Sequence, residues 1–147
     1  MAAGMTLTGE EELRKILLRA PERALQALSM ALYREGQQVM ALSKRDYVPV
    51  DMGVLRGSGT VQPPKIRGGS GVEVVLGYGG AAKAYAVVQH ENLSLNHPPK
   101  NPRRTGTRRS VRPGTARYLA IPMAERRLGM EARLAHACDV MFVKVGL

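Results

Sequence analysis

A long apolar stripe with the period of an α-helix dominates the first third of the sequence. Its positions fall three, four or seven residues apart: Leu25, Leu28, Leu32, Val39 and Leu42. Pro21 precedes the stripe, and it either kinks one long helix or begins a second helix in its first turn. The stripe predicts a long N-terminal helix that ends near Asp46, because residues 47–49 read Tyr-Val-Pro and favour extended backbone.

Two further signals bear on this helix. Thr8 is a suitable N-cap, and Glu11 stands three residues later to close a capping box. Gly36 lies on the apolar stripe, where it lowers helix propensity, and this predicts the close approach of another backbone.

Residues 47–80 change to the period of a β-sheet. Residues 54–61 predict one strand and residues 71–77 predict its antiparallel partner, with a turn-rich connection between them. Residues 81–91 then favour a short helix, although residues 85–88 also fit a strand.

The C-terminal part returns to helical periodicity. Pro122 fits the first turn of a helix that runs to about Ala137, and residues 140–145 resemble a short final strand. The expected class is therefore α+β, with a long helix on a small, mostly antiparallel sheet, a second helix and one long basic loop. The chain length of 147 residues suits a single domain over residues 1–147.

The positive charge is concentrated in the middle of the chain. Residues 63–117 hold 10 basic and 2 acidic side chains, which is net +8 of the total +10. Within them, residues 91–114 have no periodicity and several prolines, so we expect an extended loop that could span roughly 80 Å. Seven basic residues follow one another here without an acidic one between them: Lys100, Arg103, Arg104, Arg108, Arg109, Arg112 and Arg117.

Such a run attracts duplex DNA through its phosphates. It has no aromatic side chain to stack on single-stranded bases, and the chain has no zinc-finger or other motif that reads sequence. A solvated basic loop, or an arm that docks on an acidic patch of another protein, explains the same residues. Contact with DNA and contact with a neighbouring subunit both stay open.

The sequence gives little support for catalysis, a metal or a cofactor. Cys138 is the single cysteine, and its apolar surroundings favour a buried structural thiol. His90 and His97 are seven residues apart without a third ligand, and the middle region offers only Glu73 and Glu91 as carboxylates. We expect no enzyme activity, no cofactor and no bound metal.

Hydropathy argues against a membrane protein. No apolar run approaches the ~20 residues that span a bilayer. The N-terminal region turns acidic at residues 10–12, unlike a secretory signal, so the cytoplasm is the expected site of synthesis.

Several short motifs, in order, resemble a known family. Residues 49–58 read Pro-Val-Asp-Met-Gly-Val-Leu-Arg-Gly-Ser. They are similar to the pattern Pro-Val-Asp-Thr-Gly-x-Leu-Arg-x-Ser of the tail-completion, or minor capsid, proteins of tailed bacteriophages, with Met52 in place of threonine. The later positions that match are Tyr85, Ala86, Val88, His90, Glu91, Gly114, Ala116, Tyr118, Leu119 and Pro122.

The resemblance implies a structural role in the virion neck, where such proteins join head and tail. It implies a ring around the DNA path, of six copies or alternatively twelve, in contact with neighbouring neck and tail proteins. Its structural residues map to Pro49, Asp51, Gly53, Leu55, Tyr85, Glu91, Tyr118 and Pro122. We expect Gly53 to need unusual backbone angles or close packing, and Tyr85 and Val88 to pack. A monomeric basic DNA-binding module is the alternative function.

Overall fold

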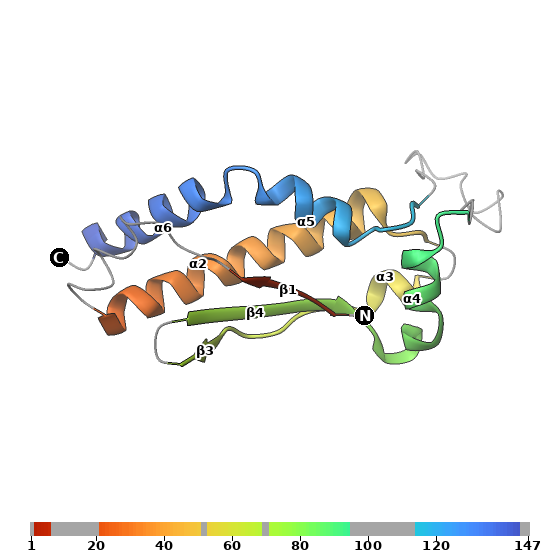
Figure 1. The fold of residues 1–147 in the computed structure, drawn as a ribbon, viewed down its shortest axis with the longest axis horizontal. Coiled ribbons are helices and arrows are strands. Elements are labelled where there is room, and N and C mark those ends of the chain that lie inside the picture. The colour runs from red at the N-terminus through yellow and green to blue at the C-terminus, as the bar shows by residue number, and fades with distance from the viewer. Residues whose placement is uncertain (1, 7–20, 51–52, 69–70, 95–113, 145–147) are drawn as a thin grey trace.

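The computed structural model describes residues 2–6, 21–50, 53–68, 71–94 and 114–144 of the chain. A long helix, α2 (Pro21–Leu42), lies between a small antiparallel sheet and two C-terminal helices (Figure 1). This arrangement confirms the predicted α+β class. The remaining elements are β1 (Ala2–Thr6), η1 (Ser43–Tyr47), α3 (Val54–Gly57), β2 (Gly59–Val61), β3 (Lys65–Arg67), β4 (Gly71–Tyr78), η2 (Gly80–Ala82), α4 (Lys83–Glu91), α5 (Ala120–Arg127) and α6 (Met130–Lys144).

Strand β4 is the centre of the sheet. Strand β1 runs antiparallel along one edge of it, with Ala2 opposite Gly77 and Thr6 opposite Glu73. Strands β2 and β3 pair in tandem with the other edge, so the sheet is three strands wide.

The alternation of β4 decides which face of the sheet meets α2. Val72, Val74, Leu76 and Tyr78 are buried, while the residues between them are half-buried. Gly36 of α2 faces this surface, and a Cβ there would lie 3.1 Å from Val74 Cγ1. The sequence predicted a close backbone behind this glycine; instead, the side chains of the sheet approach it.

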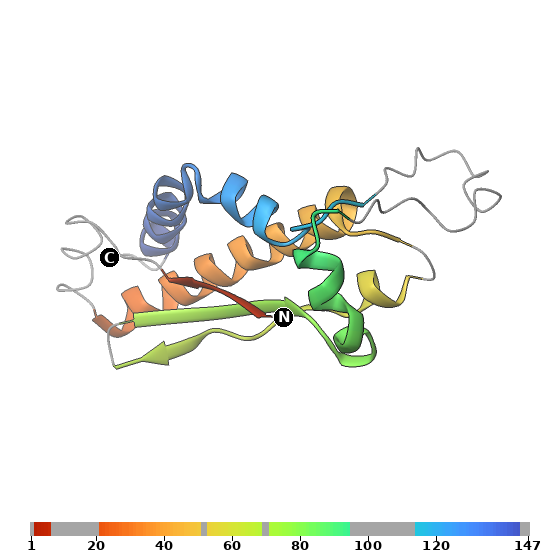
Figure 2. The same cartoon turned by 45° about the vertical axis from the view of Figure 1, so that its right-hand side comes forward.

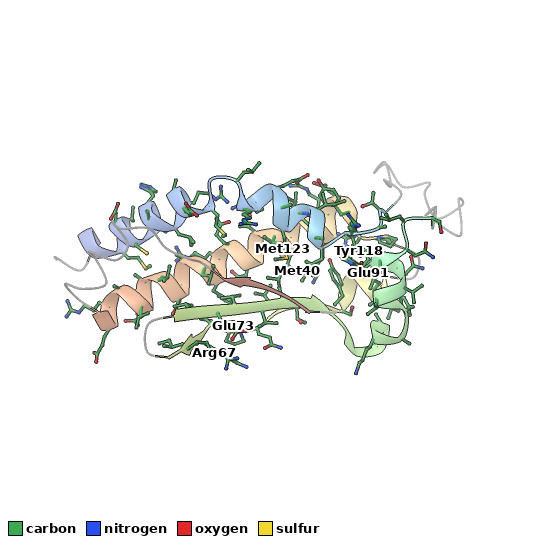
Figure 3. All side chains as sticks on the ribbon, in the orientation of Figure 1. Met40, Arg67, Glu73, Glu91, Tyr118 and Met123 are labelled. Atoms are coloured by element: carbon green, nitrogen blue, oxygen red, sulfur yellow. The ribbon has the colours of Figure 1, made fainter. Side chains whose placement is uncertain are left out.

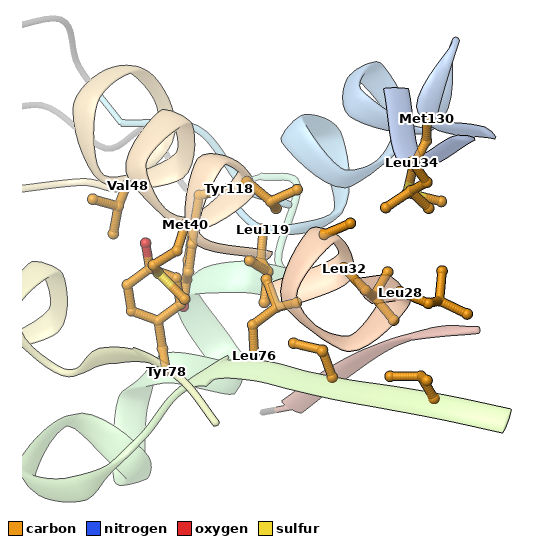
Figure 4. Packing of buried hydrophobic residues seen from close by; sticks show 14 of the residues in the cluster. Leu28, Leu32, Met40, Val48, Leu76, Tyr78, Tyr118, Leu119, Met130 and Leu134 are labelled. Atoms are coloured by element: carbon orange, nitrogen blue, oxygen red, sulfur yellow. The ribbon is translucent and has the colours of Figure 1, made fainter. Parts of the chain in front are cut away.

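The core is largely aliphatic and runs along both sides of α2. Leu32 contributes from α2, Leu76 from β4 and Leu134 from α6, and all three are almost fully buried (Figure 4). Cys138 is also buried in this cluster, at 1% exposed, as the sequence predicted. Burial raises the pKa of its thiol, and the charge of Asp139 adds a smaller increase. The raised pKa keeps the sulfur protonated.

The predicted strand over residues 54–61 is wrong in its first half. Residues 54–57 form the short helix α3, and only residues 59–61 pair with β4. The reason is Gly53, whose φ of +83° turns the chain so that the Gly57 N–H donates to the Gly53 carbonyl at 2.8 Å. No atom of the described residues lies within 4 Å of the position of a Gly53 Cβ, so the unusual backbone angle, not close packing, is the expectation that is confirmed.

The predicted C-terminal strand is also wrong, because α6 continues to Lys144. Leu134, Cys138 and Met141 keep a helical spacing and face the core, whereas Val140 points outward. The single helix predicted from Pro122 to about Ala137 is divided at Gly129, where φ is +69°. Residues 83–91 form a helix, which decides between the two predictions for that segment.

The N-terminal region differs from the prediction in one respect and is not described in another. Strand β1 was not predicted, since the sequence Ala-Ala-Gly-Met-Thr lacks apolar–polar alternation. The expected cap at Thr8 and its partner Glu11 lie outside the described residues. Helix α2 is described from Pro21.

A buried carboxylate joins α2 to both C-terminal helices. Glu35 is 7% exposed and accepts hydrogen bonds from Arg126 of α5 at 2.8 Å and from Arg133 of α6 at 2.9 Å. Burial raises the pKa of Glu35, but the hydrogen bonds and charges of the two arginines outweigh it, so the pKa lies below its ordinary value. One carboxylate therefore fixes the angle between α5 and α6.

Replacing Gly53 by valine should destabilise the protein by about 1–3 kcal/mol, because a β-branched residue is strained at this positive φ. Asparagine tolerates the left-handed region, so Gly53→Asn is the matched control and should lose much less. Chemical denaturation of the three proteins measures the difference. A valine variant as stable as the wild type would contradict the structural role of Gly53.

Replacing Glu35 by glutamine should lower stability at neutral pH by about 1–3 kcal/mol, because two charge-assisted contacts are lost. Since the folded pKa is depressed, the stabilisation is complete above the ordinary value of 4.5 and is lost as the pH falls through the folded pKa. Denaturation curves of wild type and variant should therefore converge in acid. Glu131→Gln, at an exposed position of α6, is the control; a constant gap at all pH values would contradict the assignment.

Candidate functional site

A buried tyrosine closes one end of the core and joins segments that are distant in the sequence. The ring of Tyr118 lies edge-on to Tyr78 and to His90, with ring centroids 5.0 Å apart in both pairs. Its hydroxyl donates to the Ala86 carbonyl of α4 at 2.7 Å. Figure 3 shows Tyr118 and Glu91 at this end of the molecule, where α4 lies beside the C-terminal end of α2 (Figure 2).

Ser43 extends this network into the π-helical turn η1. Its hydroxyl donates to the Tyr118 carbonyl at 2.6 Å. Because this uses its single proton, the Tyr78 hydroxyl donates to Ser43, at 2.7 Å. Burial raises the pKa of Tyr78 to about 12 and also raises that of Tyr118, so both phenols stay protonated as donors at neutral pH.

His90 is the third member of the network and is also buried, at 4% exposed. Its Nε2 faces the N–H of Ala120, which can only donate, at 3.4 Å. The proton of the neutral ring therefore belongs on Nδ1, which donates to Glu91 Oε1 at 2.6 Å. The His90 carbonyl accepts from the Arg117 N–H at 2.7 Å, so His90 holds the chain on both sides of the basic segment.

The two ends of the 91–114 segment meet at the network of Ser43, Tyr78, His90 and Tyr118, which we call the joint. The Thr115 N–H donates to the Tyr47 carbonyl at 2.8 Å. A Cβ at Gly114 would overlap the backbone nitrogen and Cα of Pro49, so only glycine fits there. Arg117 has a φ of +56°, uncommon for a residue with a side chain, and this turn brings Tyr118 into the core. The segment thus leaves and returns at one place.

Several of the sequence-predicted residues meet in or near this joint. Pro49 packs on Gly114, Glu91 bonds His90, and Tyr118 is fully buried. Leu55 and Pro122 are buried, the latter in the first turn of α5. Asp51 lies outside the described residues.

The prediction that Tyr85 and Val88 pack in the core is wrong. They are 39% and 54% exposed. In α4 the buried positions are instead Ala86 and His90, four residues apart, so the larger apolar side chains point away from the core.

Of the seven basic residues proposed for contact, the structure describes only Arg117. It is exposed at the base of the segment. The other six lie outside the described residues: Lys100, Arg103, Arg104, Arg108, Arg109 and Arg112.

Sequence reasoning missed the roles of Ser43, Tyr78 and His90. Ser43 carries no signal, since it lies beside the expected helix end. Tyr78 continues the alternation of β4, but the predicted strand ended at residue 77 because Gly79 and Gly80 follow. His90 was considered as a metal ligand with His97 and as one position of the family-like pattern, whereas the helix places it inward, in the core.

The polar groups of the joint hold its segments to one another. The hydroxyls and both imidazole nitrogens of the network have partners within the protein. A nearby pocket of about 630 Å³ lies between α3, the sheet and α4, and Lys83 is the charged residue among the described ones that line it. Among the described residues, no three His, Cys, Asp or Glu side chains are grouped as metal ligands, and no helix has the length and hydropathy to cross a bilayer.

Comparison with protein-family models, curated proteins and solved structures finds no match for the chain.

Replacing Gly114 by alanine should cost about 1–3 kcal/mol, because the added Cβ must displace Pro49 or the returning end of the segment. Gly57→Ala is the matched control, since a Cβ there, at the end of α3, has no atom within 4 Å in the part of the chain that the structure describes. Thermal melts of both variants measure the cost. Equal melting temperatures for the two would show that Gly114 and Pro49 are not held together in solution.

Proposed function

We propose that this chain is a structural subunit of a phage-type neck, where it joins head and tail as a ring around the DNA path. The observation that carries the proposal is the joint at Tyr118. Residues from three separated parts of the family-like pattern, Pro49, Glu91 and Gly114–Tyr118, contact one another or a common partner there. They hold the base of the basic segment, as expected of a scaffold that presents an arm.

The geometry of the joint limits what this arm can reach. A segment with both ends at one place extends at most half its contour length, so residues 91–114 reach about 40 Å rather than 80 Å. That distance still exceeds the ~15 Å radius of gyration of a domain of this size. The segment is therefore long enough to contact a neighbouring subunit or DNA in the channel.

Ring closure requires a head-to-tail contact repeated by rotation. In this proposal the ring holds six copies, or twelve, and meets other neck and tail proteins. The subunit is made in the host cytoplasm and ends in the virion. Light scattering of a ring of the purified protein should give a defined multiple of the 16.0 kDa chain mass, and its complex with particle neighbours should give that multiple plus the mass of the neighbours. A species that stays monomeric with those neighbours and binds duplex DNA would favour the basic DNA-binding module instead.

Four arginines of the segment should decide which partner it has. We expect replacement of Arg103, Arg104, Arg108 and Arg109 by glutamine to flatten the salt dependence of DNA retention if phosphates are the partner. If the partner is a neighbouring subunit, DNA retention should stay unchanged and ring assembly should weaken.

The matched control removes the same charge from exposed arginines elsewhere: Arg23, Arg34, Arg56 and Arg127. DNA retention on a column, measured over a salt gradient, and light scattering give the two readouts. If both variants behave alike in both assays, the basic segment has no special role, and this part of the proposal fails.

A further inference from the structure

Helix α4 exposes its larger apolar side chains to solvent, whereas an ordinary surface helix buries them. The residues it turns toward the core are small or polar, Ala86 and His90. The residues it turns outward are larger and apolar: Tyr85 at 39%, Val87 at 47% and Val88 at 54% exposed. A surface helix normally does the reverse. Exposed apolar side chains that gather on one short helix mark an interaction surface.

The charges of α4 lie on one line with the central valine. Lys83, Val87 and Glu91 are spaced four residues apart, so they follow one another along an exposed stripe. Lys83 stands at the positive end of the helix dipole and Glu91 at the negative end, which is unfavourable within α4 itself. No ion pair joins Lys83 to another of the described residues. Glu91 bonds His90 through one oxygen, and its side chain is 61% exposed.

We propose that α4 packs antiparallel against α4 of a second copy of this chain, with Val87 on the two-fold axis. In that arrangement Lys83 of each copy lies opposite Glu91 of the other, and the contact forms twice. Each charge also meets the favourable end of the facing helix dipole. Val88, about 100° around the helix from Val87, lies at the margin of this contact, whereas Tyr85, about 160° away, stays outside it.

The size of the surface sets the strength of this contact. A nine-residue helix is about 13.5 Å long. Two such helices bury less than the ~1,200 Å² of a standard interface, so a single pair forms a weak dimer. The contact differs from the head-to-tail one that closes a ring, and it joins two monomers, or two rings face to face. Several copies acting in parallel would strengthen it between rings.

A cysteine at the two-fold axis tests the geometry directly. Only a residue on the axis meets itself in the partner, and facing helices bring such Cα atoms within disulfide range. Val87→Cys should therefore form a covalent dimer under mild oxidation. Val140→Cys, at 39% exposed on α6, is the control and should stay mostly uncrosslinked, and Cys138 is buried. Failure of Val87→Cys to crosslink faster than Val140→Cys would overturn the proposal.

A charge exchange tests the pairing of the two ends. Lys83→Glu turns two attractions into two repulsions and should raise the dimer dissociation constant by roughly tenfold in low salt. The double variant Lys83→Glu/Glu91→Lys should bring it back toward the wild-type value, because the exchanged charges again face each other. Sedimentation equilibrium measures the constants, and thermal melts check that Glu91→Lys leaves the fold intact despite the loss of the His90 contact.

The outcomes of the exchange separate self-pairing from other partners. Recovery in the double variant supports the antiparallel contact, because a different protein bound to α4 would not carry the compensating change. A double variant that is no better than Lys83→Glu, or a Lys83→Glu variant with unchanged association, overturns it. Neither result affects the ring, which depends on other surfaces, so failure here and failure of the neck proposal are distinguishable.

Discussion

The burial of Tyr118 holds together one whole end of this molecule. Its hydroxyl fixes α4, its carbonyl fixes the π-helical turn after α2, and its ring fills the space between Tyr78 and His90. The alternatives for these polar atoms would be unpaired groups in an apolar core, each costing about 1–3 kcal/mol. The joint therefore forms as a unit, with every member satisfied by another member.

The remainder of the fold depends on α2 as a shared middle layer. One side of this helix covers β4, and the other carries α5 and α6. The apolar side chains of a two-sided helix occupy a wide stripe, and Glu35 can lie between the layers only because two arginines neutralise it. Helix α2 consequently brings the sheet and the C-terminal helices into one core.

The sequence predicted the elements whose periodicity was long and regular. The stripe of α2 and the alternation of β4 were enough to place the main helix against a sheet, because both patterns report burial directly. The short elements could not be predicted in this way. A single φ value at Gly53 converted the start of an apparent strand into α3, and Val140, which fits a strand, lies on the outer side of α6.

The motifs predicted some residues of the candidate site, but not the contacts that join residues distant in the sequence. Gly53, Tyr118 and Pro122 were found through their motifs, and the structure gives each a physical role in a turn or in the core. The network around Tyr118 could not be predicted from local patterns, because Ser43 and His90 lie 75 and 28 positions from Tyr118 along the chain. Tyr85 was misjudged because a motif gives residue types without saying which side of a helix faces inward.

The joint tolerates changes in the length of the segment between its two ends more readily than substitutions at those ends. Residues that leave and re-enter it are constrained by contacts such as Gly114 on Pro49, whereas the length between them is not. Doubling the length of a flexible loop costs only about 0.6 kcal/mol in closure entropy. Insertions and deletions between the two ends can therefore accumulate without disturbing the core. The length of this segment can therefore change between related sequences while the contacts that hold its two ends stay the same.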